Sequence, residues 1–429
     1  MPSKAKTYKW LGLFSLMPSI AMIFTDQAVL PVALPTIQKH LGATYSELWW
    51  SINAYLLLSA VLLLAGGKLG DRIGHRNAFI LGMLLFAVAS ALGGVSPDIY
   101  WLIGSRALQG NGAAIMIPAS SLLIMSLFPQ HERGKAIGIN VSVSSLFLIC
   151  GPLIGGYLTE SFSWRWIFWI NLPLAAIGLI LQLLFLSPSS KIKQSFDPWG
   201  FFYFVISSTS LVILTMQGSS WGWISLKSVS ILALSLISGF FLFRREKKVK
   251  NPFIDLSFFR NPIYKAVNIS VFATQFVLMI TFYRAIFFQD VLDWSPMKSG
   301  IISFIASFPV LFLSPLGGWL ADRWGHKTPI AAGFLFLIFS FLWTPFVIQG
   351  SLWMLLLGLT ALGCGVPLLV TPSYSSAVGV IPPKKAGSAF GILATTRSLS
   401  GSFGVAIIIA LTTMEAKSSW THPNPILGA

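Results

Sequence analysis

The stretch "GGKLGDRIGHR", residues 66–76, crowds four ionised side chains into one turn between two long apolar segments. Only 10% of the chain is charged, yet a similar stretch, "GGWLADRWGHK", returns at residues 317–327 with seven identical positions. A turn that only fixes membrane topology needs no set spacing of Gly, Asp, Arg and Gly, so we favour a conformational role over that simpler alternative. The residues that carry the two copies are Gly67, Asp71, Arg72, Gly74 and Arg76, then Gly318, Asp322, Arg323 and Gly325.

The composition predicts an all-α polytopic membrane protein. Hydrophobic residues make up 55% of the 429 positions, which is more than a soluble chain of this length can bury. About 20 apolar residues cross a bilayer as a helix, whereas the alternating pattern of a membrane barrel is absent. We expect about thirteen spans, at residues 10–35, 48–67, 77–96, 99–127, 135–158, 164–187, 198–217, 223–243, 264–290, 298–321, 328–348, 352–377 and 386–412.

The distribution of Lys and Arg predicts the orientation. With the N-terminus in the cytoplasm, the cytoplasmic segments carry 21 of these residues and the external segments carry 5. This places both charged turns in the cytoplasm and the chain in the inner (plasma) membrane. The same bias explains most of the net charge of +16, so we expect no nucleic-acid partner. The basic run at residues 244–250 is expected to meet anionic lipid of the bilayer.

The repeat extends beyond the charged turn. "RGKAIGI" at 133–139 resembles "AGSAFGI" at 386–392, and "QGNG" at 109–112 resembles "LGCG" at 362–365. Internal repeats are common in secondary transporters, whose sites form between the repeats. We therefore expect an N-terminal six-helix bundle at 1–187, two inserted helices with cytoplasmic linkers at 188–263, and a C-terminal bundle at 264–429.

Taken in order, these motifs resemble the major facilitator superfamily. "GKLGDRIGHR" at 67–76 is similar to its signature between helices 2 and 3, "RALQGNGAA" at 106–114 to its helix-4 motif, and "GPLIGG" at 151–156 to its antiporter-associated helix-5 motif. "TDQAVLPVALPTI" at 25–37 and "WRWIFWINLP" at 164–173 resemble the 14-helix drug:proton antiporter branch, as do the two inserted helices. The resemblance implies two six-helix bundles around a central cavity. It also implies a further helix after 386–412, and we expect that last helix to be missing.

Ionisable side chains inside a membrane span are costly and by default mark function. Asp26, Arg106, Arg284 and Arg397 fall inside expected spans, and Arg284 is near enough to an end to reach the headgroups. At the repeat offset Asp26 faces an apolar residue, Arg106 matches Leu359 and Arg397 matches a serine, so the fold alone does not require these charges. The alternative to a functional role for Asp26, Arg106 and Arg397 is a buried ion pair with a packing role.

By resemblance, helices 1 and 4 line the cavity, Asp26 is a proton or cation site, and Arg106 tunes proton release. We therefore expect Asp26, Arg106, Gln109 and Arg397 to form the coupling site and substrate cavity. Burial disfavours the ionised form of a carboxylate, whereas a neighbouring Arg favours it. A proton carrier needs these two effects to oppose each other.

The fifth expected span contains a second conformational motif. Pro152 lacks a backbone donor and bends its helix, while Gly151 and Gly155 form a face for close helix packing. By resemblance, this stretch of Gly151, Pro152, Gly155 and Gly156 seals the cavity and accompanies export. Ordinary helix packing is the alternative.

We interpret the chain as a proton-coupled exporter (antiporter) of hydrophobic or cationic drugs that works by alternating access. Its partners would be small-molecule substrates, protons and lipid, with a periplasmic adaptor protein as a candidate in a Gram-negative cell. No candidate nucleophile, metal cluster or phosphate loop is seen in the sequence, so we expect neither an enzyme nor a metal or cofactor. The alternatives are export of a dedicated metabolite or siderophore, and a transport-inactive sensor or truncated remnant.

Overall fold

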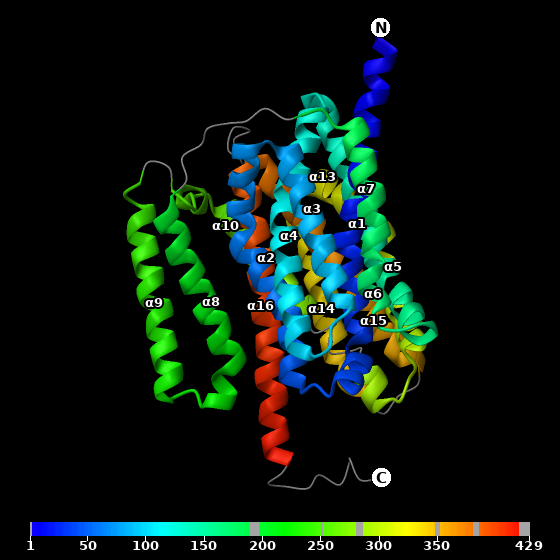
Figure 1. Ribbon diagram of the computed structural model, residues 1–429, viewed down its shortest axis with the longest axis vertical. Helices are drawn as coiled ribbons and strands as arrows, with labels where there is room; N and C mark the ends of the chain where they lie inside the picture. The colour runs from blue at the N-terminus through cyan, green and yellow to red at the C-terminus, as the bar shows by residue number, and fades with distance from the viewer. Residues whose placement is uncertain are drawn as a thin grey trace.

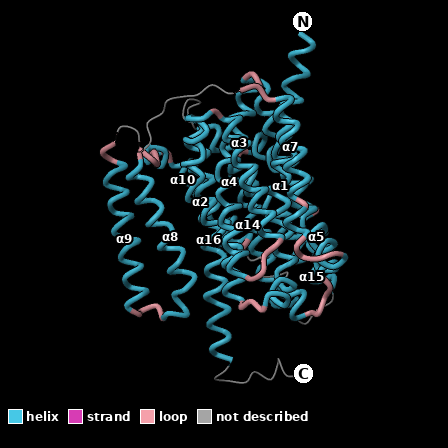
Figure 2. Tube along the Cα trace, viewed as in Figure 1, coloured by secondary structure: helices cyan, strands magenta, loops and turns pink. Residues whose placement is uncertain are grey.

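The computed structural model describes residues 2–188, 197–249, 252–279, 286–347, 352–380 and 386–419. Within these ranges the chain consists of helices joined by short loops and turns and contains no strand, as the tube in Figure 2 shows. Ten of the described helices are long and apolar enough to cross a membrane, and a shorter apolar helix covers Lys327–Trp343. The predicted fold class, an all-α polytopic membrane protein, is confirmed.

Residues 2–188 form a bundle whose long helices alternate in direction (Figure 1). Polar residues at the loop ends begin several of them, because their side-chain oxygens accept bonds from otherwise unpaired N–H groups. Thr44 and Glu47 form a reciprocal capping box, and Asp98 accepts from the Trp101 N–H. The helices are α1 (Pro2–Leu41), α2 (Tyr45–Ile73), α3 (His75–Gly94), α4 (Ile99–Leu127), α5 (Gln130–Ser161), α6 (Trp166–Trp169) and α7 (Asn171–Phe185).

The rest of the described chain continues with a helical hairpin and then a second bundle. Each of the thirteen expected spans coincides with helix in the described residues. The elements are α8 (Pro198–Trp221), α9 (Leu226–Glu246), the 3₁₀ helix η1 (Leu256–Arg260), α10 (Pro262–Leu278), the π-helix η2 (Phe287–Val291), α12 (Pro296–Ser307), α13 (Pro309–Trp324), α14 (Lys327–Val347), α15 (Leu352–Val380) and α16 (Ala386–Ser419).

Two of the expected spans contain a break in the helix but remain single segments of membrane length, Trp166–Phe185 and Pro296–Ala321. The span expected at 298–321 is divided into α12 and α13 at Pro309, a residue that has no N–H to continue the helical ladder. The span expected at 164–187 consists of the single turn α6 followed by α7. Residues 280–285, in the middle of the span expected at 264–290, lie outside the described residues.

The two halves repeat the same close backbone contacts. A Cβ on Gly82 would lie 2.8 Å from the carbonyl oxygen of Gly112, and a Cβ on Gly333 would lie 2.8 Å from that of Gly365. These pairs sit at equivalent positions of the repeat and join α3 to α4 and α14 to α15. A side chain at any of these glycines would force the helices apart, which explains why the repeat preserves glycine here.

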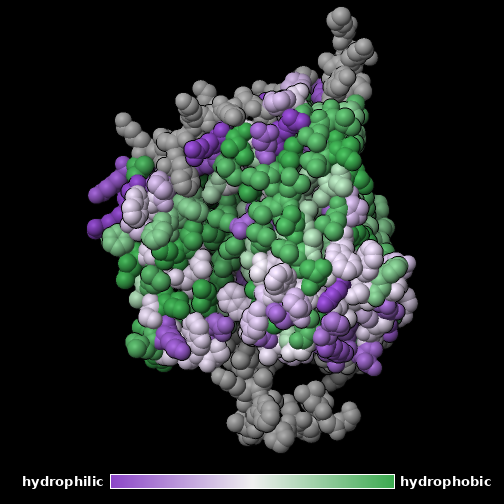
Figure 3. All heavy atoms as spheres, viewed as in Figure 1, coloured by the Kyte–Doolittle hydropathy of each residue, from purple (hydrophilic) through white to green (hydrophobic). Residues whose placement is uncertain are grey.

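The inserted helices α8 and α9 form a hairpin that stands beside the bundle (Figure 1). Its helices are joined by a reciprocal pair of bonds, because the Ser207 and Ser235 hydroxyls each donate to the other's carbonyl, at 3.0 and 2.9 Å. The hairpin reaches the bundle through α8, which packs on α16 and α2. Figure 3 shows apolar side chains over the middle of one face and hydrophilic residues gathered toward both ends, as a protein in a bilayer requires.

Candidate functional site

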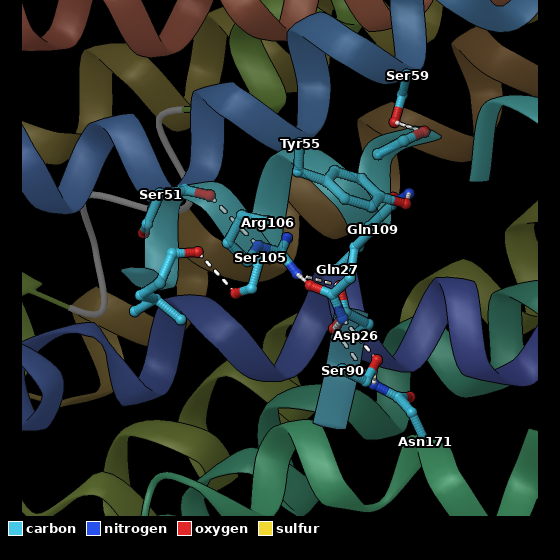
Figure 4. A network of polar contacts seen from close by, with 12 residues as sticks. Asp26, Gln27, Ser51, Tyr55, Ser59, Ser90, Ser105, Arg106, Gln109 and Asn171 are labelled. Atoms are coloured by element: carbon cyan, nitrogen blue, oxygen red, sulfur yellow. Dashed lines mark hydrogen bonds and ion pairs between the residues drawn. The ribbon is translucent and has the colours of Figure 1, made fainter. Parts of the chain in front are cut away.

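The charged pair Asp26–Arg106 lies inside the first bundle and joins α1 to α4 (Figure 4). The Arg106 Nη1 donates to Asp26 Oδ2 at 2.6 Å, and each residue is only 1% exposed. Removing two charges from water is expensive unless they are paired and their other donors and acceptors are bonded. The stability of the pair therefore depends on the hydrogen bonds that neighbouring groups make with it.

A ring of polar side chains completes the bonds of this pair. Gln109, one helical turn after Arg106, accepts from Arg106 Nη1 at 2.6 Å and donates to Asp26 Oδ1 at 3.0 Å. Ser90 of α3 accepts from Gln109 at 2.8 Å and from Asn171 of α7 at 3.2 Å. Asn171 also donates to Asp26 Oδ1 at 3.4 Å. Asp26, Arg106, Gln109, Ser90 and Asn171 are named here the buried polar cluster, and four helices contribute to it.

Helix α2 closes the remaining side of the guanidinium. Arg106 Nε donates to the Ser51 carbonyl at 3.3 Å, and its guanidinium carbon lies 4.6 Å from the centre of the Tyr55 ring. A cation over an aromatic face gains electrostatic energy, especially away from water. The Tyr55 hydroxyl accepts from Gln27 of α1 at 3.1 Å. A change in the charge of Asp26 would thus alter contacts that join α1, α2, α3, α4 and α7.

The second half offers a control on what this cluster is for. The positions that match Asp26 and Arg106 at the repeat offset are Leu278 or Met279 and Leu359. Met279 is 4% exposed and Leu359 is 8% exposed, each packed in an apolar cluster. A bundle of this design is therefore built without the ion pair in the second half, and packing alone does not explain its presence in the first.

The structure brings together three of the four expected cavity residues and places the fourth elsewhere. Asp26, Arg106 and Gln109 share the buried polar cluster, whereas Arg397 lies on α16 and donates from Nε to Gln275 Oε1 of α10 at 3.1 Å. Arg284 lies outside the described residues. Sequence reasoning missed Ser90, Asn171 and Tyr55, since a single Ser, Asn or Tyr in an apolar span is common and carries no spacing signal.

The first charged turn connects α2 to α3 through Gly74, whose φ of 92° favours glycine. Asp71 pairs with His75 one turn later, with 3.5 Å between Oδ1 and Nε2. Arg76 donates to the Leu183 carbonyl at 3.4 Å, near the end of α7, whereas Arg72 is exposed. Arg76 therefore links the first charged turn to the end of α7. A Cβ on Gly67 would lie 3.6 Å from the Pro118 side chain, an ordinary contact, while Gly66 packs tightly on the α4 backbone.

The second charged turn has the same backbone device. Gly325, between α13 and α14, has a φ of 80°, and Gly318 faces the methyl group of Thr371. The Arg323 guanidinium lies 5.3 Å from the centre of the Trp319 ring. The side chain of Asp322 lies outside the described part of the structure. Both copies thus provide a glycine that reverses the chain between consecutive helices.

The glycine motif of α5 faces two partners. A Cβ on Gly155 would lie 2.8 Å from the Val29 carbonyl oxygen of α1, and Gly151 packs on the neighbouring Ala28. Gly156 faces α12 instead, where a Cβ would lie 2.6 Å from the Pro296 carbonyl oxygen. The carbonyl of Pro152 lies against Gly300 of α12. The motif therefore packs α5 on α1 within the first half and on α12 across the two halves.

Contacts between the halves also gather at the end of the bundle opposite the charged turns. Gln289 donates to the Val32 carbonyl at 2.7 Å, and the Tyr45 hydroxyl donates to Asp290 at 3.3 Å. The Met297 N–H donates to Glu160 at 2.8 Å. These bonds join the ends of α1, α2 and α5 to η2 and the start of α12, so they close this end in the present conformation.

A duplicated bundle of membrane-length helices with a buried charged pair is typical of secondary transporters. The family model described as Major Facilitator Superfamily matches residues 16–405, and the chain belongs to this superfamily. It is 32% identical over 426 residues to the multidrug resistance protein Stp of Mycobacterium tuberculosis, covering 97% of this chain and 78% of that protein. It is also 32% identical to the riboflavin transporter RibZ of Clostridioides difficile, covering 93% and 87%.

Solved structures agree on the fold. A crystal structure of the peptide transporter POT in complex with sulfate superimposes with a TM-score of 0.67 at 14% identity, covering 95% of this chain and 94% of that one. At that identity the likeness shows the architecture alone. The predicted membership of the major facilitator superfamily is confirmed.

Proposed function

We propose that this transporter is a proton-coupled exporter of hydrophobic small molecules, in which Asp26 carries the proton. The observation that carries the proposal is the ion pair between Asp26 and Arg106, fully buried in one half and absent from the matching positions of the other. A transporter of this class needs a charge whose state can alter helix packing, and this is a carboxylate within a membrane span.

The coupling step follows from the bonds of the cluster. When Asp26 is ionised, it holds Arg106, Gln109 and Asn171 by three hydrogen bonds. A proton on Asp26 removes the charge that compensates the guanidinium, so Arg106 must find another partner or move toward water. Since Arg106 also binds the Ser51 carbonyl and the Tyr55 ring, the movement reaches α2, which packs on α16 of the second half.

The closed end supports alternating access as the transport mode. Its bonds between Gln289 and Val32, and between Tyr45 and Asp290, join the two halves where each half contributes helix ends. Rocking of the halves must break them to open this end. We propose that the divisions 1–187, 188–263 and 264–429 are the moving and inserted parts, that the charged turns face the cytoplasm, and that the membrane is the inner (plasma) membrane.

The test is dye transport by the full chain in proteoliposomes under an imposed pH gradient. Hoechst 33342 is the substrate, and the matched variant carries Asp26→Asn together with Arg106→Gln, which removes the titratable group without leaving a lone buried charge. We expect gradient-driven transport by the wild type and only downhill, gradient-independent movement by the double variant. Wild-type coupling in the double variant would refute the role of Asp26. Absence of movement of any dye by the wild type would support a transport-inactive protein.

A second candidate is export or uptake of a dedicated metabolite, which the similarity to RibZ favours. Riboflavin added to the same proteoliposomes discriminates between the two. Saturable riboflavin transport with no movement of Hoechst 33342 would support a dedicated transporter, and movement of several unrelated dyes would support a multidrug exporter.

A further inference from the structure

Arg397 is a cation deep within α16 that the proposed coupling step does not use. The helix begins at Ala386, so Arg397 lies about 16 Å along its axis at 1.5 Å per residue. Its side chain is half-buried, unlike Arg106, which is 1% exposed. Its one bond to a described residue runs from Nε to Gln275 Oε1, at 3.1 Å.

The surroundings place Arg397 at the seam between the two halves. One turn later, a Cβ on Gly401 would lie 3.4 Å from Leu56 of α2 and 3.7 Å from Gln275 of α10. Further along the same helix, Asn53 of α2 donates to the Ser402 carbonyl at 3.3 Å. Arg397 and Gln275 therefore lie where α10 and α16 of the second half meet α2 of the first.

No carboxylate pairs with Arg397 in the part of the chain that the structure describes. Asp26 is the one acid placed well inside a span, and Arg106, Gln109 and Asn171 occupy its two oxygens. The other twelve acids belong to loops or to the end turns of helices. A half-buried guanidinium gains from an anionic partner, and none of the described carboxylates supplies one here.

We infer that Arg397, with Gln275 holding its Nε, forms an anion-recognition subsite at this seam, which takes the carboxylate of an amphipathic substrate. The bond to Gln275 fixes the guanidinium and leaves its two Nη groups to donate in parallel to a carboxylate. The inference rests on the proposed export function and specifies its substrate class: hydrophobic molecules that carry an acidic group. It differs from the expected preference for cationic drugs, because the carboxylate of Asp26 is already fully bonded.

The test compares two dyes that share a three-ring skeleton, anionic fluorescein and cationic rhodamine 123. Their dissociation constants are measured by fluorescence anisotropy with the full chain in nanodiscs of phosphatidylcholine, which carries no net charge, so that an anionic lipid headgroup does not compete. We expect the wild type to bind fluorescein more tightly than rhodamine 123. Arg397→Gln should weaken fluorescein binding about tenfold or more, the effect of one charge-assisted hydrogen bond, and should not weaken rhodamine 123 binding.

Three variants complete the design. Arg397→Lys should retain part of the fluorescein affinity, and Arg260→Gln, an exposed arginine in η1, should leave it unchanged. Gln275→Glu supplies an internal carboxylate beside Arg397 and should also block fluorescein, which tests the subsite even if Arg397→Gln fails to fold. A second series adds vesicles with phosphatidylglycerol, where loss of fluorescein binding by competition would assign the subsite to lipid headgroups instead.

The inference is overturned if the wild type binds no fluorescein, or if Arg397→Gln or Gln275→Glu leaves its affinity unchanged or weakens both dyes equally. Failure of the proposed export function can be distinguished from failure of the subsite, because transport and binding are measured in separate assays. A wild type that binds fluorescein through Arg397 but moves no dye would refute the export function and keep the subsite. A wild type that exports fluorescein with no dependence on Arg397 would keep the function and refute the subsite.

Discussion

Breaking one side of the Asp26–Arg106 pair should destabilise the first bundle far more than removing both charges. Asp26→Asn leaves the guanidinium of Arg106, which is 1% exposed, with the neutral partners Gln109 and Ser51. Arg106→Gln leaves the carboxylate with Gln109 and Asn171. Each single change leaves an uncompensated buried charge, which costs about 3–5 kcal/mol in free energy of unfolding.

The double variant should recover most of this loss. Replacing a buried ion pair by neutral groups of similar volume is often close to neutral, and Asn and Gln can bond to each other as well as to Ser90 and Asn171. We expect a total cost below about 2 kcal/mol, against a sum of at least about 6 kcal/mol for the two single changes, and therefore a coupling energy of at least about 4 kcal/mol between the two positions. A cycle of this kind isolates the pair from the packing of each side chain.

The assay is unfolding of the purified chain in dodecylmaltoside titrated with SDS, followed by tryptophan fluorescence. Trp49 and Trp164 are fully buried in the first half and contribute to the signal there. Gln182→Leu is the matched control, because Gln182 is buried in the same bundle and bonds to Ser19 at 2.7 Å without contacting the pair. Additive effects of Asp26→Asn and Arg106→Gln, or single losses below about 1 kcal/mol, would refute the reasoning.

Three further predictions follow from other parts of the fold. Gly300→Ala places a methyl group against the Pro152 carbonyl and should separate α12 from α5. The distance between spin labels at Glu160 and Lys298 should therefore increase, and an unchanged distance would contradict this contact. Gly74→Ala forces a non-glycine residue to a φ of 92° and should lower the stability by about 1–2 kcal/mol, whereas Gly104→Ala, which meets open space, should not. In a background without Cys150 and Cys364, a cysteine at the exposed Asn77 should escape an impermeant thiol reagent added outside intact cells, and ready labelling would reverse the predicted orientation.

The sequence by itself determined the class of protein and the order of its spans. A bilayer requires long apolar helices, so the positions of the spans can be read from composition, whereas the breaks within the spans expected at 164–187 and 298–321 could not. The repeat of the charged turn indicated duplication, because close backbone packing admits only glycine at set positions. The structure repeats those contacts at Gly82 with Gly112 and at Gly333 with Gly365.

The tertiary structure decided which intramembrane charges act together. Asp26 and Arg106 are 80 residues apart and meet only because α1 packs beside α4, and Ser90 and Asn171 join them from two other helices. Arg397 and Arg106 both lie within expected membrane spans. Arg397 nevertheless faces the seam without a carboxylate partner among the described residues. Hydropathy gives the depth of a side chain along the bilayer normal, whereas its partners depend on the rotation and neighbours of its helix, which only packing fixes.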